Sequence, residues 1–342
     1  MDKIKLINEE GQIVIDSNIM LHGQEASAGS KMLESYIAPY SSHIVEKLEQ
    51  EAKNILGIGQ INEFGLGQAS SQSVQVIAGE KAEVGVGAII GSSYLNLLAS
   101  KGLNGFLASN GTISRYGIVS VSSSFTRPLI FGGFQKILEI FNIIGGHDPR
   151  DPMSINTDMD LEFIDMDIDK LSFGIYGGSE KDLDSFSNKN QVILDHGQYI
   201  RSVFDVILSV EVAGSTARFD GIRYGYVTDS YEDMDELYAK TRAEAFGTDT
   251  KKAIVKGNIY AGHSYERNAY ENAIRMRRVL VEEVDRILDA YDFIIASVDS
   301  DLAILASLAN KPLALVGDML ILAGRYQDEK LLTLGKIIEE EL

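Results

Sequence analysis

The stretch Gln12-Ile-Val-Ile-Asp-Ser-Asn18 is the point from which the fold can be worked out. Its run of β-branched residues predicts a strand, and a shorter run at 3–7 predicts another strand just before it. Ser42 is an N-cap residue type, and it precedes an amphipathic helical period that we expect to end at Gly57. Residues 55–58 lead into a further strand. A strand, a helix and a strand in this order are typical of α/β folds.

The same alternation continues through the rest of the chain. Residues 65–91 are rich in glycine and serine, which indicates either a loop region around a site or a backbone packed closely against a neighbour. Residues 179–191 are polar and without period, and they predict a loop. The remaining predicted elements are, in chain order, helices at 134–144, 233–246 and 265–290, a strand at 293–297, a helix at 302–309, a strand at 313–316 and a terminal helix that ends in 339–342.

Composition limits the function classes. With 342 residues, of which 45% are hydrophobic, the chain can form one large α/β domain or two smaller ones, and no long polar linker requires two. The formal charge of −19 repels phosphate backbones, so we expect no direct binding of nucleic acid. The chain has no cysteine, and no apolar run reaches the roughly 18 residues that a membrane span requires. We therefore expect a soluble, cytoplasmic protein with no membrane contact.

The motifs for cofactors and metals are incomplete. The pair Gly85-Val-Gly87 is followed by Gly91 one residue too late for a dinucleotide fingerprint, so close packing is the favoured interpretation of these glycines. The acidic alternation at 165–169 lacks the glycine and the glutamate of a calcium loop, and it predicts a solvated face. The histidines at positions 22, 43, 147, 196 and 263 have no metal-binding spacing. The sequence therefore predicts neither a metal nor a cofactor.

The stretch from Gly91 to Gly117 is the best candidate for a catalytic segment. It begins Gly91-Ser-Ser93, and glycine beside paired serines can turn sharply while it presents a hydroxyl and free N–H groups. A nucleophile with an oxyanion site needs this combination. The same residues also form ordinary turns, so the chemistry depends on the rest of the chain.

Six blocks follow one another along the chain: Ser30-Lys-Met-Leu-Glu-Ser-Tyr-Ile-Ala-Pro-Tyr40, Asn62-Glu-Phe-Gly-Leu-Gly67, Ser114-Arg-Tyr-Gly-Ile-Val119, Gly146-His-Asp-Pro149, Ala217-Arg-Phe-Asp-Gly-Ile-Arg-Tyr-Gly225 and Thr241-Arg-Ala-Glu-Ala-Phe-Gly247. In this order they resemble one family, the amidase-signature hydrolases. The resemblance implies a single domain over 1–342, with a mixed central sheet covered by helices on both faces. Relative to the family pattern, an N-terminal helical segment is absent, and stretches before 90, around 185 and after 299 are shortened.

The resemblance also implies where catalytic residues should lie. Members of the family use a lysine base, a bridging serine in a cis peptide and a nucleophilic serine. The lysine position corresponds to Asp16, which is shorter and carries the opposite charge. The glycine-serine block with the bridging serine has no counterpart. The nucleophile position corresponds to Ser93, after Gly91 and Ser92, and without an activating base this serine is interpreted as a turn hydroxyl.

The implied ligand-binding residues are better preserved. In glutamine-using members an arginine binds the substrate carboxylate, and that position corresponds to Arg218. An aspartate that holds the amino group corresponds to Asp301, if one gap is allowed. The alternative for Arg218 is an ion pair with Asp220 or another nearby carboxylate that shapes the loop.

Three functional hypotheses follow. The first is a pseudoenzyme that binds a glutamine-like ligand, a second copy of itself or a partner subunit of an amidotransferase-like assembly. The alternative is a working amidase or amidotransferase subunit in which Ser93 is activated by a substitute base, Lys81, Lys101 or Asp16. A third, narrower hypothesis is a sensor that binds glutamine or a related amino acid without turnover.

Overall fold

A computed structural model describes residues 4–157, 159–177, 186–262 and 268–341 of the chain. His263 and residues 179–185 of the expected loop lie outside the described residues. One sheet of eleven strands runs through the described residues, in the order β1-β3-β2-β4-β6-β5-β10-β11-β9-β7-β8. The strands are β1 Lys5–Leu6, β2 Ile13–Asp16, β3 Ile55–Gly59, β4 Val84–Ile89, β5 Asn104–Leu107, β6 Arg127–Gly132, β7 Phe173–Tyr176, β8 Lys189–Val192, β9 Phe293–Ser297, β10 Leu313–Val316 and β11 Met319–Ala323.

The sheet is mixed. β2 pairs in parallel with β3 on one side and with β4 on the other, and β7 pairs in parallel with β8 and β9. Antiparallel pairs of β6, β5, β10 and β11 join these two parallel parts. Because the carboxyl ends of parallel strands meet at one edge, β2, β3 and β4 direct their following loops to the same place. Asp16 is the last residue of β2 and lies at that edge.

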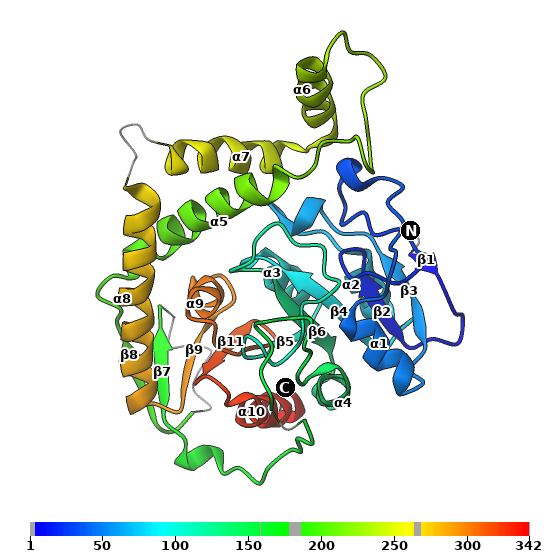
Figure 1. Ribbon diagram of the computed structural model, residues 1–342. Coiled ribbons are helices and arrows are strands. Elements are labelled where there is room, and N and C mark those ends of the chain that lie inside the picture. The colour runs from blue at the N-terminus through cyan, green and yellow to red at the C-terminus, as the bar shows by residue number, and fades with distance from the viewer. Residues whose placement is uncertain (1–3, 158, 178–185, 263–267, 342) are drawn as a thin grey trace.

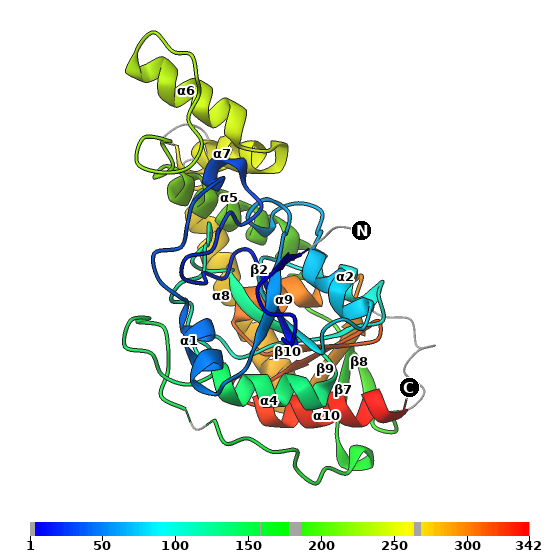
Figure 2. The ribbon, with the colours of Figure 1, turned by 90° about the vertical axis from the view of Figure 1, so that its right-hand side faces the viewer.

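Helices cover both faces of the sheet, as expected (Figure 1). In Figure 2, α4 and α10 run side by side below the sheet, whereas α2, α5 and α9 lie above it. The helices are α1 His43–Gln50, α2 Gln72–Ala78, α3 Ser93–Ala99, α4 Phe134–Ile144, α5 Ile200–Thr216, α6 Met234–Ala245, α7 Thr248–Ala261, α8 Ala269–Ala290, α9 Leu302–Ala309 and α10 Asp328–Glu341, with short 3₁₀ helices η1 Lys31–Leu33, η2 Glu63–Gly65, η3 Ile168–Lys170 and η5 Gly197–Tyr199.

Side-chain alternation along β2 assigns each residue to one face. Ile13 and Ile15 belong to the core shared with α1, α4 and α10, whereas Val14 belongs to the core shared with α2, α3, α5, α8 and α9. Asp16 follows Val14 by two residues and therefore points toward the second face. The strand thus places one carboxylate inside an otherwise apolar layer.

Several predicted boundaries are confirmed and others are wrong. The helix at 134–144 and the elements at 293–297, 302–309 and 313–316 match the structure. The first helix begins after its N-cap Ser42 but ends at Gln50, because the chain reverses through the positive φ of Ala52 before it enters β3. The glycine-rich segment 65–91 is not a continuous loop but contains α2 and β4. No helix in the described part of the chain is long and apolar enough to cross a membrane.

Candidate functional site

Asp16 is the centre of a buried polar cluster on the α2–α3 side of the sheet. Its side chain is fully buried. Oδ1 accepts a hydrogen bond from Ser71 Oγ at 3.1 Å, and Oδ2 accepts one from the Tyr94 hydroxyl at 2.6 Å. The Tyr94 and Ser71 oxygens lie 2.9 Å apart. Asp16, Ser71 and Tyr94 therefore form a closed triangle, which we call the Asp16 cluster.

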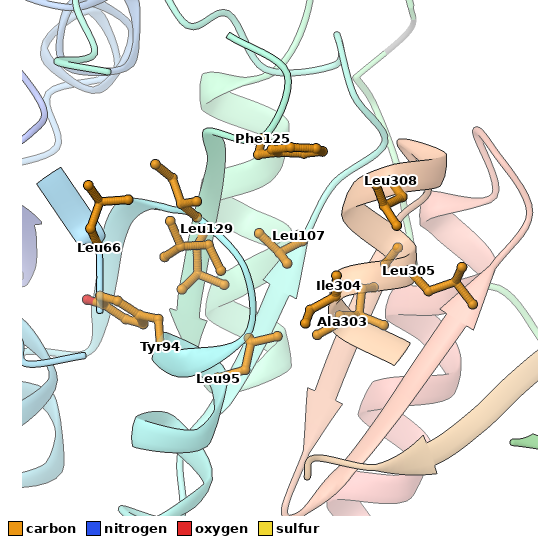
Figure 3. Packing of buried hydrophobic residues seen from close by; sticks show 14 of the residues in the cluster. Leu66, Tyr94, Leu95, Leu107, Phe125, Leu129, Ala303, Ile304, Leu305 and Leu308 are labelled. Atoms are coloured by element: carbon orange, nitrogen blue, oxygen red, sulfur yellow. The ribbon is translucent and has the colours of Figure 1, made fainter. Parts of the chain in front are cut away.

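Two short helices hold the other members of the Asp16 cluster. Ser71 is the N-cap of α2, and its Oγ also accepts the N–H of Val74 at 3.2 Å. Tyr94 is the second residue of α3. Figure 3 shows the Tyr94 ring at the edge of the apolar core, with its hydroxyl pointing away from Leu95 and Leu107. The apolar ring and the polar tip of tyrosine match these two environments.

Glycines on β4 make room for this arrangement. A Cβ atom on Gly87 would lie 2.3 Å from Asp16 Oδ2, and one on Gly85 would lie 2.1 Å from Cζ of Phe131. Neither position can accept a side chain without displacing its neighbour. The close-packing interpretation of these two glycines is confirmed.

Burial controls the electrostatics of the Asp16 cluster. Desolvation raises the pKa of Asp16 from 3.8 to about 6, and the hydrogen bonds from Tyr94, Ser73 and Ser71 oppose this rise. Burial, together with the charge of Asp16, raises the pKa of Tyr94 well above 10. At neutral pH the cluster therefore consists of a carboxylate and two neutral hydroxyls. It has no lysine ammonium among the described residues that contact it.

Ser93 is the first residue of α3 and directly precedes Tyr94, but Ser93 is not a member of the Asp16 cluster. Its side chain is partly exposed, and its hydroxyl makes no hydrogen bond among the described residues. Gly91 adopts a φ of +74°, and a Cβ there would lie 3.3 Å from the ring of Phe204 on α5. The turn therefore needs glycine at this position. Lys81 and Lys101 are exposed, and no hydrogen bond joins either one to Ser93 in the described structure.

Arg218 lines a separate aromatic pocket of about 240 Å³. It follows the C-terminal end of α5, and its guanidinium donates to the carbonyl of Ser120 at 2.8 Å. Asp220 lies 3.7 Å from Arg223 instead, so the alternative of an Arg218–Asp220 pair finds no support in the described contacts. The other walls of the Arg218 pocket come from Met20, Leu33, Tyr36, Tyr40, Gly117, Ile118, Val119, Phe219 and Tyr224.

The Arg218 pocket is close to the Asp16 cluster along the chain. Met20, a wall of the pocket, is four residues from Asp16, so their Cα atoms are at most about 14 Å apart. Backbone hydrogen bonds join this segment to the 117–119 wall, from Met20 N–H to the carbonyl of Gly117 at 3.0 Å and from Val119 N–H to that of Asn18 at 2.8 Å. A ligand in this pocket would therefore lie in the neighbourhood of the implied catalytic centre.

Asp301 does not share the Arg218 pocket. Its Oδ1 lies 2.6 Å from Nε of Arg201, at the N-terminal end of α5. Arg218 lies just beyond the other end of this helix of 17 residues, which is about 25 Å long. The structure therefore does not bring Asp301 and Arg218 together, and the implied pairing of an amino-group site with a carboxylate site has no geometric support.

Two carboxylates, not identified from the sequence, make contacts among five of the six blocks. Glu63 accepts hydrogen bonds from Ser30 Oγ at 2.6 Å and from Gly247 N–H at 2.8 Å, and it also bonds Thr250 Oγ1. Asp148 accepts from Ser114 Oγ at 2.8 Å and pairs with Arg150 and His43. Hydrogen bonds from Arg150 and Ser114 hold the pKa of Asp148 down at about 2, against the opposing effect of burial. Glu63 thus connects three blocks, and Asp148 connects two others.

Ser71 and Tyr94 are the site residues that the sequence did not reveal. Ser71 lies in the glycine- and serine-rich segment 65–91, and the structure puts it against Asp16. The signal that could have found it is its position as an N-cap before an apolar helical period. Tyr94 had no such signal, because a tyrosine beside Ser93 is consistent with a simple core residue.

Comparison with known proteins agrees with this architecture. A family model described as Amidase matches residues 188–322. The A subunit of the glutamyl-tRNA(Gln) amidotransferase of Thermoanaerobacter pseudethanolicus is 29% identical over 349 residues, which cover 89% of this chain and 71% of that protein. With its mixed sheet and ordered motif blocks, the chain is similar to amidase-signature proteins over most of its length.

Solved structures share the fold. The A subunit of the glutamyl-tRNA(Gln) amidotransferase from Thermotoga maritima has a TM-score of 0.75 at 16% identity, over 99% of this chain and 86% of that one. A peptide amidase from Stenotrophomonas maltophilia has a TM-score of 0.74 at 16% identity, over 96% of this chain and 82% of that one. The predicted α/β fold with a mixed, two-sided sheet is confirmed.

Proposed function

We propose that this chain acts as a binding subunit of an amidotransferase-like assembly, holding a small carboxylate ligand without hydrolysing an amide itself. The observation that carries this proposal is Asp16. A carboxylate that is fully buried and bonded through both oxygens stands where the family resemblance requires a neutral lysine. The reaction of the family depends on that amine to draw a proton from the nucleophile.

The contacts of the Asp16 cluster argue against a substitute relay. A carboxylate with a pKa of about 6 is a competent general base in principle. However, Ser71 already donates to Asp16, accepts the N–H of Val74 and touches Tyr94. One acceptor site remains on Ser71, but no hydrogen bond joins Ser71 to Ser93 among the described residues, so the structure shows no proton path from Ser93 to Asp16.

The Arg218 pocket supports the binding half of the proposal. Its volume of about 240 Å³ is below the roughly 300–1,000 Å³ of pockets for drug-sized ligands, so it suits a ligand of amino-acid size. One guanidinium nitrogen is used by Ser120, and the others are available for a carboxylate. A glutamine-like amino acid is the occupant that we propose.

The names of the relatives support the assembly half. The two amidotransferase relatives described above are each named as one subunit of such an enzyme. A chain that retains the family fold but binds its ligand unchanged could position that ligand for a partner protein. Another copy of this chain is less suitable as the partner, because each copy carries a formal charge of −19.

The second candidate function is an active amidotransferase subunit that uses Ser93. The observation in its favour is the turn at Gly91, which presents a partly exposed serine at the start of α3. The names of the relatives favour it as well. It requires a base that reaches Ser93 on ligand or partner binding.

A glutaminase assay separates the two candidates. Purified protein would be incubated with glutamine, alone and together with the other subunits of an amidotransferase, and ammonia release would be measured. The proposal expects wild type to release no more ammonia than Ser93→Ala. Ser92→Ala is the matched control, since it removes the adjacent hydroxyl. Turnover by wild type and Ser92→Ala that Ser93→Ala abolishes would establish the active candidate.

Calorimetry tests the ligand. We expect glutamine or a close analogue to bind wild type, and Arg218→Ala to weaken binding by roughly 10- to 100-fold, as expected for a lost charge-assisted contact. Arg223→Ala is the control, because Arg223 is an exposed arginine of the same loop that is absent from the pocket. Equal affinities of the two variants would remove Arg218 from the binding site.

A further inference from the structure

A second cavity, of about 610 Å³, lies behind the Asp16 cluster. It opens between the loop after β3, helix α2 and helix α3, and it shares no lining residue with the Arg218 pocket. Ser71 is part of its wall, so the cavity borders the Asp16 cluster directly. Its volume falls within the range of about 300–1,000 Å³ that organic ligands occupy.

The charge of this cavity is opposite to that of the protein. The chain contains 50 Asp and Glu residues, yet no lining residue of this cavity is acidic, and Lys81 is its cation. The Lys81 ammonium has no ion-pair partner within the described part of the chain. Glu80, its neighbour in sequence, lines a different cavity. A locally positive recess in an acidic protein attracts and retains anions.

The amide side chains of the cavity are oriented as donors. The Gln60 amide oxygen accepts from Ser27 Oγ at 3.0 Å, and the Gln72 amide oxygen accepts the N–H of Gln60 at 3.1 Å. Their NH₂ groups are therefore the parts left to contact an occupant. Gln75, on the exposed side of α2, adds a third amide. Together with Lys81, these groups match an acceptor-rich ligand.

The remaining wall is apolar. Ile61, Val76 and Leu97 line the cavity on the side of the core. A ligand that only carried charge would leave this surface uncovered, whereas an organic body would cover it and gain hydrophobic stabilisation. The lining thus combines one charged end with an apolar side.

We propose that this cavity is a binding site for a small organic anion. The anionic group lies at Lys81 and the glutamine amides, and the apolar body packs on Ile61, Val76 and Leu97. This site is independent of the Arg218 pocket and of the proposed function, because it stands on different residues. Its occupant contacts Ser71 and so reaches the Asp16 cluster through that hydroxyl.

The test uses an organic anion with an intrinsic signal, 8-anilinonaphthalene-1-sulfonate, titrated by fluorescence into the folded full-length protein. We expect Lys81→Gln to raise its Kd at least fivefold. Lys101→Gln, which removes an exposed lysine outside the cavity lining, should leave the Kd within twofold of wild type. Gln75→Glu should raise the Kd at least tenfold, because it places a carboxylate at the mouth. The neutral analogue N-phenyl-1-naphthylamine should be insensitive to Lys81→Gln.

The outcomes are distinct. Equal Kd values for Lys81→Gln and Lys101→Gln, or equal sensitivity of the neutral dye, would overturn the proposal. Circular dichroism and thermal unfolding of each variant exclude loss of folding as the cause, since Lys81, Lys101 and Gln75 are all exposed.

A second measurement needs no bound dye. The chain contains no tryptophan, so Leu97→Trp places a single fluorophore in the cavity wall. Iodide should quench this tryptophan more strongly than caesium does, and adding Lys81→Gln should lower the iodide quenching constant at least twofold without changing that of caesium. An iodide constant that does not respond to Lys81→Gln would contradict the inferred positive potential.

Discussion

Replacement of Asp16 by asparagine tests the buried charge most directly. Removing a fully buried, doubly hydrogen-bonded side chain usually costs about 1–3 kcal/mol. Asp16→Asn should instead stabilise the protein at neutral pH. Asparagine has the shape of the protonated acid, so it can still accept from Ser71 and can donate to the oxygen of Tyr94.

The magnitude follows from the pKa of Asp16, which burial raises from 3.8 to about 6. Because the folded state binds the proton more tightly than the unfolded state, the ionised form weakens folding, and stability falls as pH rises from about 4 to above 6. The full difference corresponds to about 3 kcal/mol at pH 7.5 and to about half of that at pH 5. Below pH 4 it approaches zero, since both states are then protonated.

The assay is urea unfolding followed by tyrosine fluorescence, for wild type and Asp16→Asn, at pH 7.5, 5 and 4. We expect the free energy of unfolding of the variant to exceed that of wild type at pH 7.5 and the difference to shrink as the pH falls. Asp165→Asn, at an exposed carboxylate, should differ from wild type by no more than about 0.5 kcal/mol. A difference that stays constant over this pH range, or a destabilised variant at pH 7.5, would refute the reasoning.

Two further predictions concern the same cluster. Tyr94→Phe removes the hydroxyl that donates to Asp16 at 2.6 Å. Thermal unfolding should show that the free energy of unfolding falls by about 1–3 kcal/mol at pH 7.5 and by less at pH 4, where the carboxyl is protonated. Equal losses at both pH values would show that packing alone is responsible. Gly87→Ala places a Cβ 2.3 Å from Asp16 Oδ2 and should destabilise by about 2 kcal/mol or more. Gly214→Ala, in α5 with open space around it, should instead stabilise by about 0.5–1 kcal/mol, and the same sign for both alanines would contradict the packing argument.

The fold was largely predictable because its signals are local. Apolar periods and β-branched runs identified α4, β9, α9 and β10 with their correct boundaries. Helix α2 and strand β4 within 65–91 were not predicted, although the close packing of Gly85 and Gly87 was; the sequence could not show that Phe131 and Asp16 are the neighbours of these glycines. These contacts depend on strands that approach each other only in the folded sheet.

The candidate site was predictable only in part. Asp16, Ser93 and Arg218 could be located because each lies within a recognisable block. The partners of Asp16 could not, since Ser71 is 55 residues away and Tyr94 is 78 residues away. The roles of Asp16, Ser93 and Arg218 in ligand binding or catalysis remain predictions.

The contacts of Glu63 have a consequence for motion. This one side chain holds Ser30, Gly247 and Thr250, so its partners lie 33 to 187 residues away along the chain. Segments that share one acceptor open together when the carboxylate itself moves away, because all three contacts are then lost at once. Amide hydrogens at Gly247 and around Ser30 should therefore exchange with solvent at similar rates, as a single cooperative unit. Local opening at Glu63 would then release all of these segments at the same time.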